Sequence, residues 1–66
     1  MSTLAEEYPK EQRRLQELLE VYKSIGPAGA FGYVAIRDVL NRANRASAEH
    51  DTVAMIGCFK EMKECQ

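Results

Sequence analysis

Apolar residues recur at the spacing of an amphipathic helix in the first third of the chain. They follow the i, i+3, i+4, i+7 pattern, which places side chains on one helical face. These positions are Leu15, Leu18, Leu19, Tyr22 and Ile25, with Tyr8 one heptad earlier. Pro9 suits a first helical turn, where its missing N–H matters least. The pattern predicts a helix over 9–24 that ends at Gly26.

The residues before Pro9 admit two interpretations. Thr3 and Glu6 have the spacing of a capping box, which would begin the helix earlier. The other interpretation is that residues 1–8 form a loosely ordered N-terminal segment. The sequence leaves both interpretations open.

Two further helices are predicted downstream. The segment 33–48 carries one apolar stripe, and the segment 52–64 carries another after Asp51, a favourable N-cap residue. The first of these stripes comprises Ile36, Leu40, Ala43 and Ser47, widened by Tyr33, Val39 and Ala46. The inner stripe of the last helix comprises Met55, Ile56, Phe59 and Met62, with Val53 at its start. No segment alternates as a strand would, so we predict a small all-α three-helix bundle, a single domain over 1–66.

Helix-breaking residues separate the first two predicted helices. Residues 26–32 read Gly-Pro-Ala-Gly-Ala-Phe-Gly and hold three of the four glycines of the chain. Such a run predicts a connection between helices. Phe31 lies in the middle of the run and is predicted to anchor this connection onto the core.

The last predicted helix is apolar on more than one side. Besides its inner stripe, Met55, Cys58 and Met62 form an overlapping stripe that extends to Cys65. A 66-residue chain buries only about 60% of its unfolded surface and is marginally stable alone. We therefore expect a homo-oligomer, a dimer or larger, with Met55, Cys58 and Met62 as its self-association residues. The alternative is a monomer whose methionine patch a different protein covers.

Charge distinguishes the second predicted helix. The formal net charge of the chain is −1, which argues against a simple binder of polyanions. Residues 26–48, however, hold three Arg and one Asp. Arg37, Asn41 and Arg45 recur at every fourth position, and Arg42 lies beside them. Arg and Asn bind phosphates or base edges, and Arg also anchors protein interfaces, so these residues are candidate contacts for a partner or ligand. An ordinary solvated helix face is the alternative.

The glycine-rich run leads into a predicted helix N-terminus. Backbone N–H groups and the helix dipole favour an anion there, which makes Gly29, Gly32 and Tyr33 candidate contacts for a phosphorylated ligand. The run is not a Walker loop, because no Gly-Lys-Ser/Thr follows, and no strand precedes it as in a dinucleotide fingerprint. A tight turn with Phe31 in the core is the alternative.

The sequence offers no constellation for catalysis, a metal or a cofactor. Cys58 and Cys65 are seven residues apart in a predicted helix, about 10.5 Å of rise, which is too far for a disulfide. Together with His50, the only histidine, they do not complete a four-ligand zinc site. No apolar run reaches the roughly 20 residues that span a bilayer. We expect no enzyme, no catalytic residue, no metal, no cofactor and no membrane contact.

Two parts of the chain resemble known proteins. The run 40–46, the turn at His50-Asp51 and the apolar series that follows resemble a tetratricopeptide helix pair. A solenoid needs about three stacked repeats. The chain has room for one, so this resemblance implies a helical hairpin only. Glu7-Tyr8-Pro9, the run 18–23 and above all the run 25–32 are similar to short hypothetical accessory proteins of temperate phages and prophages of Proteobacteria.

The phage resemblance implies a protein that acts by binding in the cytoplasm of the bacterial host cell. The expected function is to bind and inhibit or redirect a host defence or regulatory protein. One alternative is an oligomeric sponge that sequesters a nucleotide-derived defence signal with the glycine-rich run and the helix arginines. A second alternative is a small DNA-binding regulator, for which three arginines are few because DNA affinity is built from many phosphate contacts.

Overall fold

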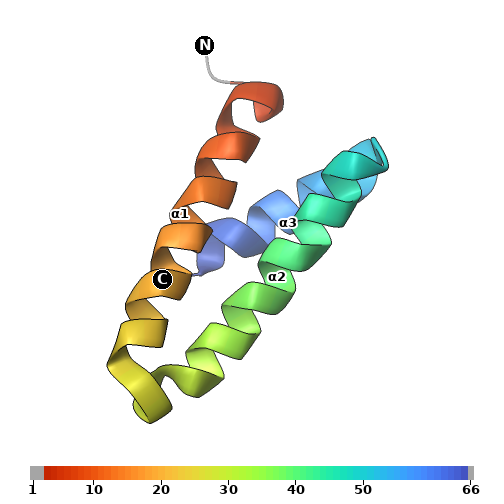
Figure 1. Ribbon diagram of the computed structural model, residues 1–66. Helices are drawn as coiled ribbons and strands as arrows, with labels where there is room; N and C mark the ends of the chain where they lie inside the picture. The colour runs from red at the N-terminus through yellow and green to blue at the C-terminus, as the bar shows by residue number, and fades with distance from the viewer. Residues whose placement is uncertain (1–2, 66) are drawn as a thin grey trace.

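The computed structural model describes residues 3–65, and almost all of this range is helical (Figure 1). Helix α1 spans Leu4–Ile25, the 3₁₀ turn η1 spans Gly26–Gly29, α2 spans Ala30–Ala48 and α3 spans Thr52–Glu64. The predicted all-α class is confirmed. Helical backbone runs from Leu4 to Ala48 with one sharp bend at η1, so α1 and α2 form a hairpin, and α3 crosses its arms.

Helix α1 begins earlier than the start predicted at Pro9. The Thr3 side-chain oxygen accepts a hydrogen bond from the Glu6 N–H at 3.2 Å and caps the helix. Glu6 and Glu7 then place negative charge in the first turn, where the helix dipole favours it. Pro9 therefore lies inside the helix. Of the segment 1–8 that the sequence left open, residues 4–8 are helical, and Met1 and Ser2 lie outside the described residues.

The connection predicted over residues 26–32 is shorter in the structure. Gly26 ends α1 with φ of +83°, a conformation that favours glycine, and α2 already begins at Ala30 instead of residue 33. A Cβ atom at Gly29 would lie 2.5 Å from the Tyr22 carbonyl oxygen, and one at Gly32 would lie 2.8 Å from the Tyr22 ring. The missing side chains let α2 start directly against Tyr22, so a long connection is unnecessary.

Phe31 does not anchor this connection. Its side chain is 88% exposed, so the prediction that it packs into the core was wrong. Residue 31 belongs to the first turn of α2, and Tyr22 occupies the space between the arms that Phe31 was expected to fill.

The core lies at the end of the hairpin that α3 crosses. Its buried members are Tyr8, Leu15, Ile36, Leu40, Ala43, Ala46, Cys58 and Met62. The Tyr8 hydroxyl donates to the Ala43 carbonyl at 2.7 Å, which joins α1 to α2, and its ring stacks on Phe59 with centroids 6.3 Å apart. Burial, with a contribution from Cys58, raises the pKa of the Tyr8 phenol.

Helix α3 has the predicted bounds, but the side predicted for self-association is buried and part of the predicted inner side is exposed. The Asp51 carboxylate caps it by accepting from the Ala54 N–H at 3.1 Å, as predicted. Cys58 and Met62 are buried in the chain's own core, whereas Val53 and Ile56 are 81% and 55% exposed. Periodicity showed that α3 is apolar on two sides. It did not show which of these sides packs against the hairpin.

The residues predicted for self-association lie mostly in the interior of the single chain. Met62 is completely buried, Cys58 is buried and Met55 is half-buried within one chain. This stripe completes the hydrophobic core of the monomer, and it offers little surface to a second copy.

Polar side chains fix both sides of α3 to the hairpin. From α1, the Arg14 guanidinium donates to the Cys65 carbonyl at 2.8 Å and also to the Met62 carbonyl. Both carbonyls lie at the C-terminal end of α3, where the Met62 carbonyl also accepts from the Cys65 N–H at 3.2 Å. From α2, Arg42 donates to Glu61. The C-terminal end of α3 is therefore held against the middle of α1.

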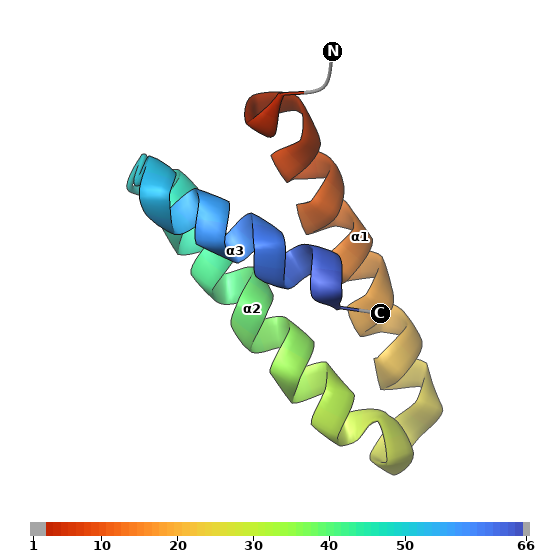
Figure 2. The same ribbon diagram turned by 180° about the vertical axis from the view of Figure 1, so that it is seen from behind.

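Helix α3 covers only part of the hairpin. It is 13 residues long, whereas α1 and α2 have 22 and 19 residues. In both ribbon views the turn between α1 and α2 lies well beyond the last residue of α3 (Figure 2). The molecule therefore has a covered end, with the core, and a free hairpin end.

Candidate functional site

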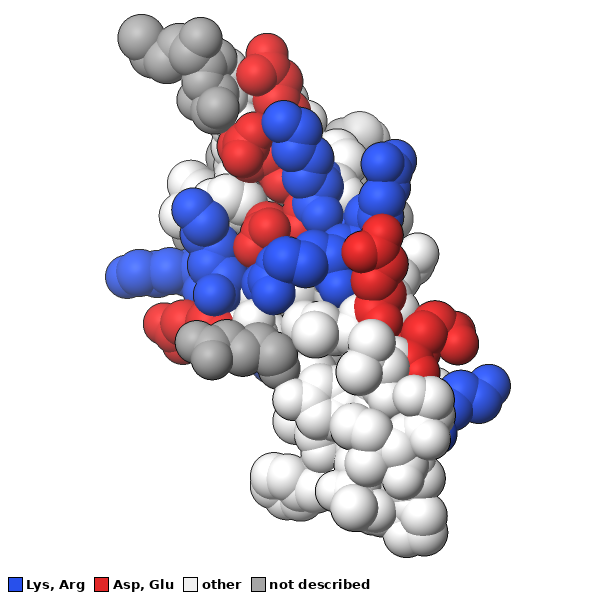
Figure 3. All heavy atoms as spheres, turned by 90° about the vertical axis from the view of Figure 1, so that its left-hand side faces the viewer, with Lys and Arg blue, Asp and Glu red and all other residues white. Residues whose placement is uncertain are grey.

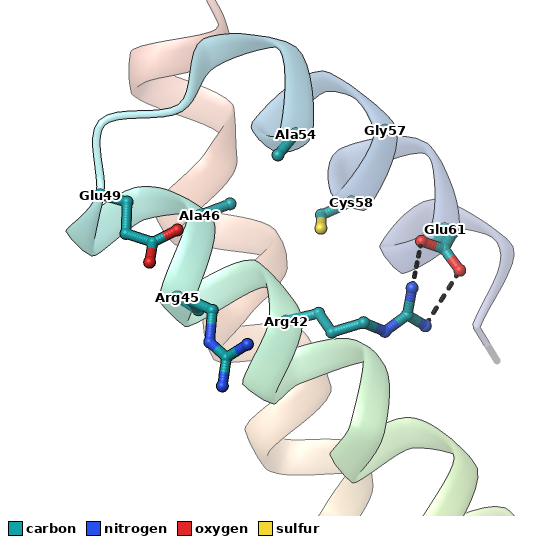
Figure 4. A pocket seen from close by; sticks show the side chains of 8 residues that line it. All are labelled: Arg42, Arg45, Ala46, Glu49, Ala54, Gly57, Cys58 and Glu61. Atoms are coloured by element: carbon teal, nitrogen blue, oxygen red, sulfur yellow. Dashed lines mark hydrogen bonds and ion pairs between the residues drawn. The ribbon is translucent and has the colours of Figure 1, made fainter.

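Helix α2, which carries the three arginines, and helix α3 line a shallow groove of about 350 Å³ (Figure 4). Small residues form its apolar part: Ala46, Ala54, Gly57 and Cys58. Charged side chains of both signs form its rim: Arg42, Arg45, Glu49 and Glu61. The groove is open, and its small floor residues leave room for a side chain from outside. It therefore suits contact with a protein surface better than enclosure of a small molecule.

Arg42 is engaged in ion pairs within the chain and contributes mainly to the packing of α2 against α3. Its guanidinium makes two hydrogen bonds to Glu61, at 2.9 and 3.1 Å, and a third to Asp38 at 3.1 Å. The hydrogen bond with Glu61 is the main reason that the pKa of Arg42 is raised. A bidentate arginine–carboxylate pair fixes geometry as well as charge. Arg42 thus closes one end of the groove and joins α2 to α3.

Three other predicted residues share an exposed face of α2, which we call the arginine ridge: Arg37, Asn41 and Arg45. Their four-residue spacing spans about 12 Å along the helix. The Arg37 guanidinium lies 5.7 Å from the centroid of the Tyr33 ring, a cation–π contact. Within residues 3–65, neither Arg37 nor Arg45 forms an ion pair. In residues 3–65, the two arginines of the ridge therefore carry positive charge outside any ion pair.

The arginine ridge borders the groove through Arg45. Figure 4 shows Arg45 beside Ala46 on α2, with Cys58 and Gly57 on the facing helix α3. Arg45 is therefore the residue at which the ridge and the groove meet.

The predicted anion contacts Gly29, Gly32 and Tyr33 lie elsewhere. Gly29 is 16 residues from Arg45, roughly 24 Å along the helix. Gly29 is buried, and both glycines pack against Tyr22. Tyr33 is half-buried and lines a separate apolar hollow of about 410 Å³ with Tyr22, Lys23, Gly26, Pro27 and Ala30. The structure does not bring the glycine-rich run and the groove arginines into one site.

Neither cysteine is activated as a nucleophile. Both thiols are free. Burial, followed by the negative charge of Glu61, raises the pKa of Cys58, and burial is also the main cause of the raised pKa of Cys65. A raised pKa keeps a thiol protonated at neutral pH, and the protonated form is the unreactive one. Cys58 contributes to the groove as a small packing residue.

One exposed surface was not predicted from the sequence. Val21, Ile25, Phe31 and Val34 are all more than half exposed at the free hairpin end. The apolar pattern had placed Ile25 and Phe31 in the core. The signal that could have revealed this surface is charge, because no Asp, Glu, Lys or Arg occurs between Ser24 and Ile36.

Metal-binding and membrane-spanning features are absent from the described residues. No group of three or more His, Cys, Asp or Glu side chains in residues 3–65 is arranged to hold a metal ion. In the same range, no helix combines the length and the hydropathy that a membrane crossing requires.

Comparisons with known proteins add no relative. The chain gave no match to a protein-family model and no significant match to a curated protein or to a solved structure. Its function is therefore inferred from the geometry of the groove and of the arginine ridge.

Proposed function

We propose that this chain is a non-enzymatic binding module that docks a segment of another protein along α2. One observation carries the proposal. The arginine ridge presents two arginines without an ion-pair partner in the described chain, and one of them, Arg45, borders a groove with an apolar floor. Arginine is favoured at protein interfaces because its planar guanidinium recognises carboxylates in a fixed geometry.

The chemistry of this surface indicates the kind of segment that fits. The spacing of Arg37 and Arg45 matches carboxylates about two helical turns apart, because each residue advances about 1.5 Å. The floor of the groove accepts small apolar side chains between Ala46 and Gly57. An acidic amphipathic helix supplies both features, as in other helix-in-groove complexes.

The resemblance to phage accessory proteins supplies the biological setting of the proposal. In that setting the partner is a host defence or regulatory protein, and binding blocks or redirects it. A small helical protein performs this task without chemistry of its own, since occupying a surface is sufficient.

The two alternatives have less support. A nucleotide sponge would combine Gly29 and Gly32 with the arginines, but these glycines pack against Tyr22, far along α2 from Arg45. A DNA-binding surface needs many cationic contacts, and Arg42 is paired with Asp38 and Glu61. Two unpaired arginines remain on this face of α2, too few for DNA but enough for a short acidic helix.

Binding to a synthetic acidic peptide tests this proposal, before capture of a partner from host lysate. A fluorescent helical peptide with Glu at i, i+4 and i+8 and alanines between them is titrated with the full chain. We expect binding that weakens with salt and that the double variant Arg37→Glu/Arg45→Glu abolishes. The matched control is Arg13→Glu, which removes an exposed arginine from α1.

The control and the lysate experiment decide the interpretation. Equal loss of binding in Arg13→Glu would mean that the peptide binds by general charge attraction. It would contradict specific recognition by the arginine ridge. Capture from host lysate should then recover a protein that wild type and Arg13→Glu retain and the double variant loses. Tight binding of nucleotides or duplex DNA, with no peptide binding, would favour the alternatives instead.

A further inference from the structure

The free hairpin end is an apolar surface that the proposed function does not use. We propose that two copies of this chain associate through it, with Phe31 at the centre of the contact. The hairpin end comprises the last two turns of α1, η1 and the first two turns of α2. This proposal rests on the apolar side chains of the hairpin end and shares only Arg37, at its border, with the arginine ridge, so either proposal can fail without the other.

Exposure of large apolar side chains is concentrated at the hairpin end. Of the six such side chains that are more than half exposed in residues 3–65, four lie there: Val21 at 54%, Ile25 at 52%, Phe31 at 88% and Val34 at 55%. Together they expose on the order of 400 Å² of apolar surface, the size of the largest patch on a typical monomer. Patches of this size in monomers are often functional.

Three of the four exposed residues, Val21, Ile25 and Phe31, continue the helix faces from which Arg14 and Arg42 reach α3 at the other end. On α1, Arg14 reaches α3, and Leu18, Val21 and Ile25 follow it at i+4, i+7 and i+11. On α2, Arg42 reaches α3, and Ala35 and Phe31 precede it by seven and eleven residues. The faces of α1 and α2 that meet α3 therefore continue to the hairpin end, where they become uncharged. Helix α3 covers only the first part of these faces.

The charge pattern favours a second copy as the occupant. No charged residue occurs between Ser24 and Ile36, and Figure 3 shows an uncharged lower end below a densely charged upper part. Each arm borders this region with one charge of each sign, Glu20 and Lys23 on α1 and Arg37 and Asp38 on α2. A border of net zero charge is complementary to its own copy in a two-fold arrangement. An anionic lipid surface or a nucleic acid would select a net basic border instead.

The available area indicates a modest affinity. A standard specific interface buries about 800 Å² per partner, and the four large side chains supply about half of that. The turn and the alanines around Phe31 supply most of the remainder. We therefore expect a dimer with a dissociation constant in the micromolar range.

Sedimentation of the full chain over a range of concentrations tests this proposal. Wild type should change from monomer to dimer as the concentration rises. Phe31→Glu should raise the dimer dissociation constant by about 30-fold, the effect of losing a central contact. The variant should still fold, because residue 31 is exposed and a glutamate in the first turn of α2 suits the helix dipole.

Val53→Glu is the matched control, because Val53 is 81% exposed on α3 at the covered end. This variant should dimerise like wild type. In Phe31→Trp, the tryptophan emission should shift to shorter wavelength as the dimer forms. A wild type that stays monomeric at all concentrations overturns the proposal. So does a dimer that Val53→Glu disrupts and Phe31→Glu does not. Binding of the monomer to phosphatidylcholine–phosphatidylglycerol vesicles, lost in Phe31→Glu, would identify the hairpin end as a lipid contact and overturn it as well.

Discussion

The two ends of the α1/α2 hairpin are built from the same two helices but differ in how deeply their apolar side chains are buried. At the covered end, Tyr8, Leu15 and Leu40 are almost fully buried in the core that they share with Cys58 and Met62 of α3. At the free end, Ile25 and Phe31 belong to the same two helices and stay exposed. An apolar stripe thus becomes core only where a third element reaches it. The length of α3 decides where the core of this chain ends.

The polar contacts follow the same division. The hydrogen bond from Tyr8 to Ala43, the Arg14 contacts and the Arg42–Glu61 pair all lie at the covered end. The free end is closed by the approach of glycine backbone to Tyr22. Stability therefore concentrates at one end, and accessible apolar surface concentrates at the other.

Truncation of one core and one surface side chain should distinguish the two ends of the hairpin most clearly. Met62→Ala removes a completely buried side chain and should lower the free energy of unfolding by about 2–4 kcal/mol. Phe31→Ala removes a larger but 88% exposed side chain and should change it by no more than about 0.5 kcal/mol in the monomer. Urea denaturation followed by circular dichroism measures both. A similar loss in the two variants would mean that Phe31 is packed.

Two glycine substitutions give the next largest contrast. Gly29→Ala places a Cβ atom 2.5 Å from the Tyr22 carbonyl oxygen and should destabilise the chain by about 1–3 kcal/mol. Gly57→Ala meets nothing within 4 Å in the middle of α3 and should stabilise it by about 0.5–1 kcal/mol. Thermal melts at low concentration compare the pair. If both alanines were neutral, the close approach at the hairpin turn would not be a constraint.

A smaller effect should appear as pH rises. The pKa of Tyr8 and that of Cys58 are raised in the folded chain, mainly by burial. The unfolded chain therefore loses these protons first. The stability that they contribute is present below the ordinary values of about 8.5 for Cys and 10 for Tyr and is lost above them. The free energy of unfolding should thus stay level at neutral pH and fall as the pH rises above these ordinary values. In Tyr8→Phe this fall should be shallower, and an unchanged slope would contradict the assignment to Tyr8.

Local sequence signals predicted most of the secondary structure. The bounds of α3, its Asp51 cap and the C-terminal limit of α2 near Ala48 were correct, because caps and periodicity are properties of neighbouring residues. The start of α2 was wrong. Glycines that break an isolated helix are tolerated where Tyr22 of the opposing arm packs on them.

The candidate site was predictable in part. The exposed face with Arg37, Asn41 and Arg45 follows from helical spacing alone. The pairing of Arg42 with Glu61 does not, since the two residues are brought together only by the packing of α3 on α2. The groove beside Arg45 likewise exists only between two helices.

The amino-acid sequence by itself determined that the chain is all-α, where its last helix begins and ends, and which residues share each helix face. Those properties depend on contacts within a few residues, so the periodicity of side chains along one helix is enough. Only the tertiary structure decided which of the two apolar sides of α3 became core and how far along the hairpin the core extends. It thereby left Phe31 in solvent and placed Met62 in the interior. Those outcomes depend on the length and crossing of α3 relative to two longer helices, a relation between distant segments that no local pattern records.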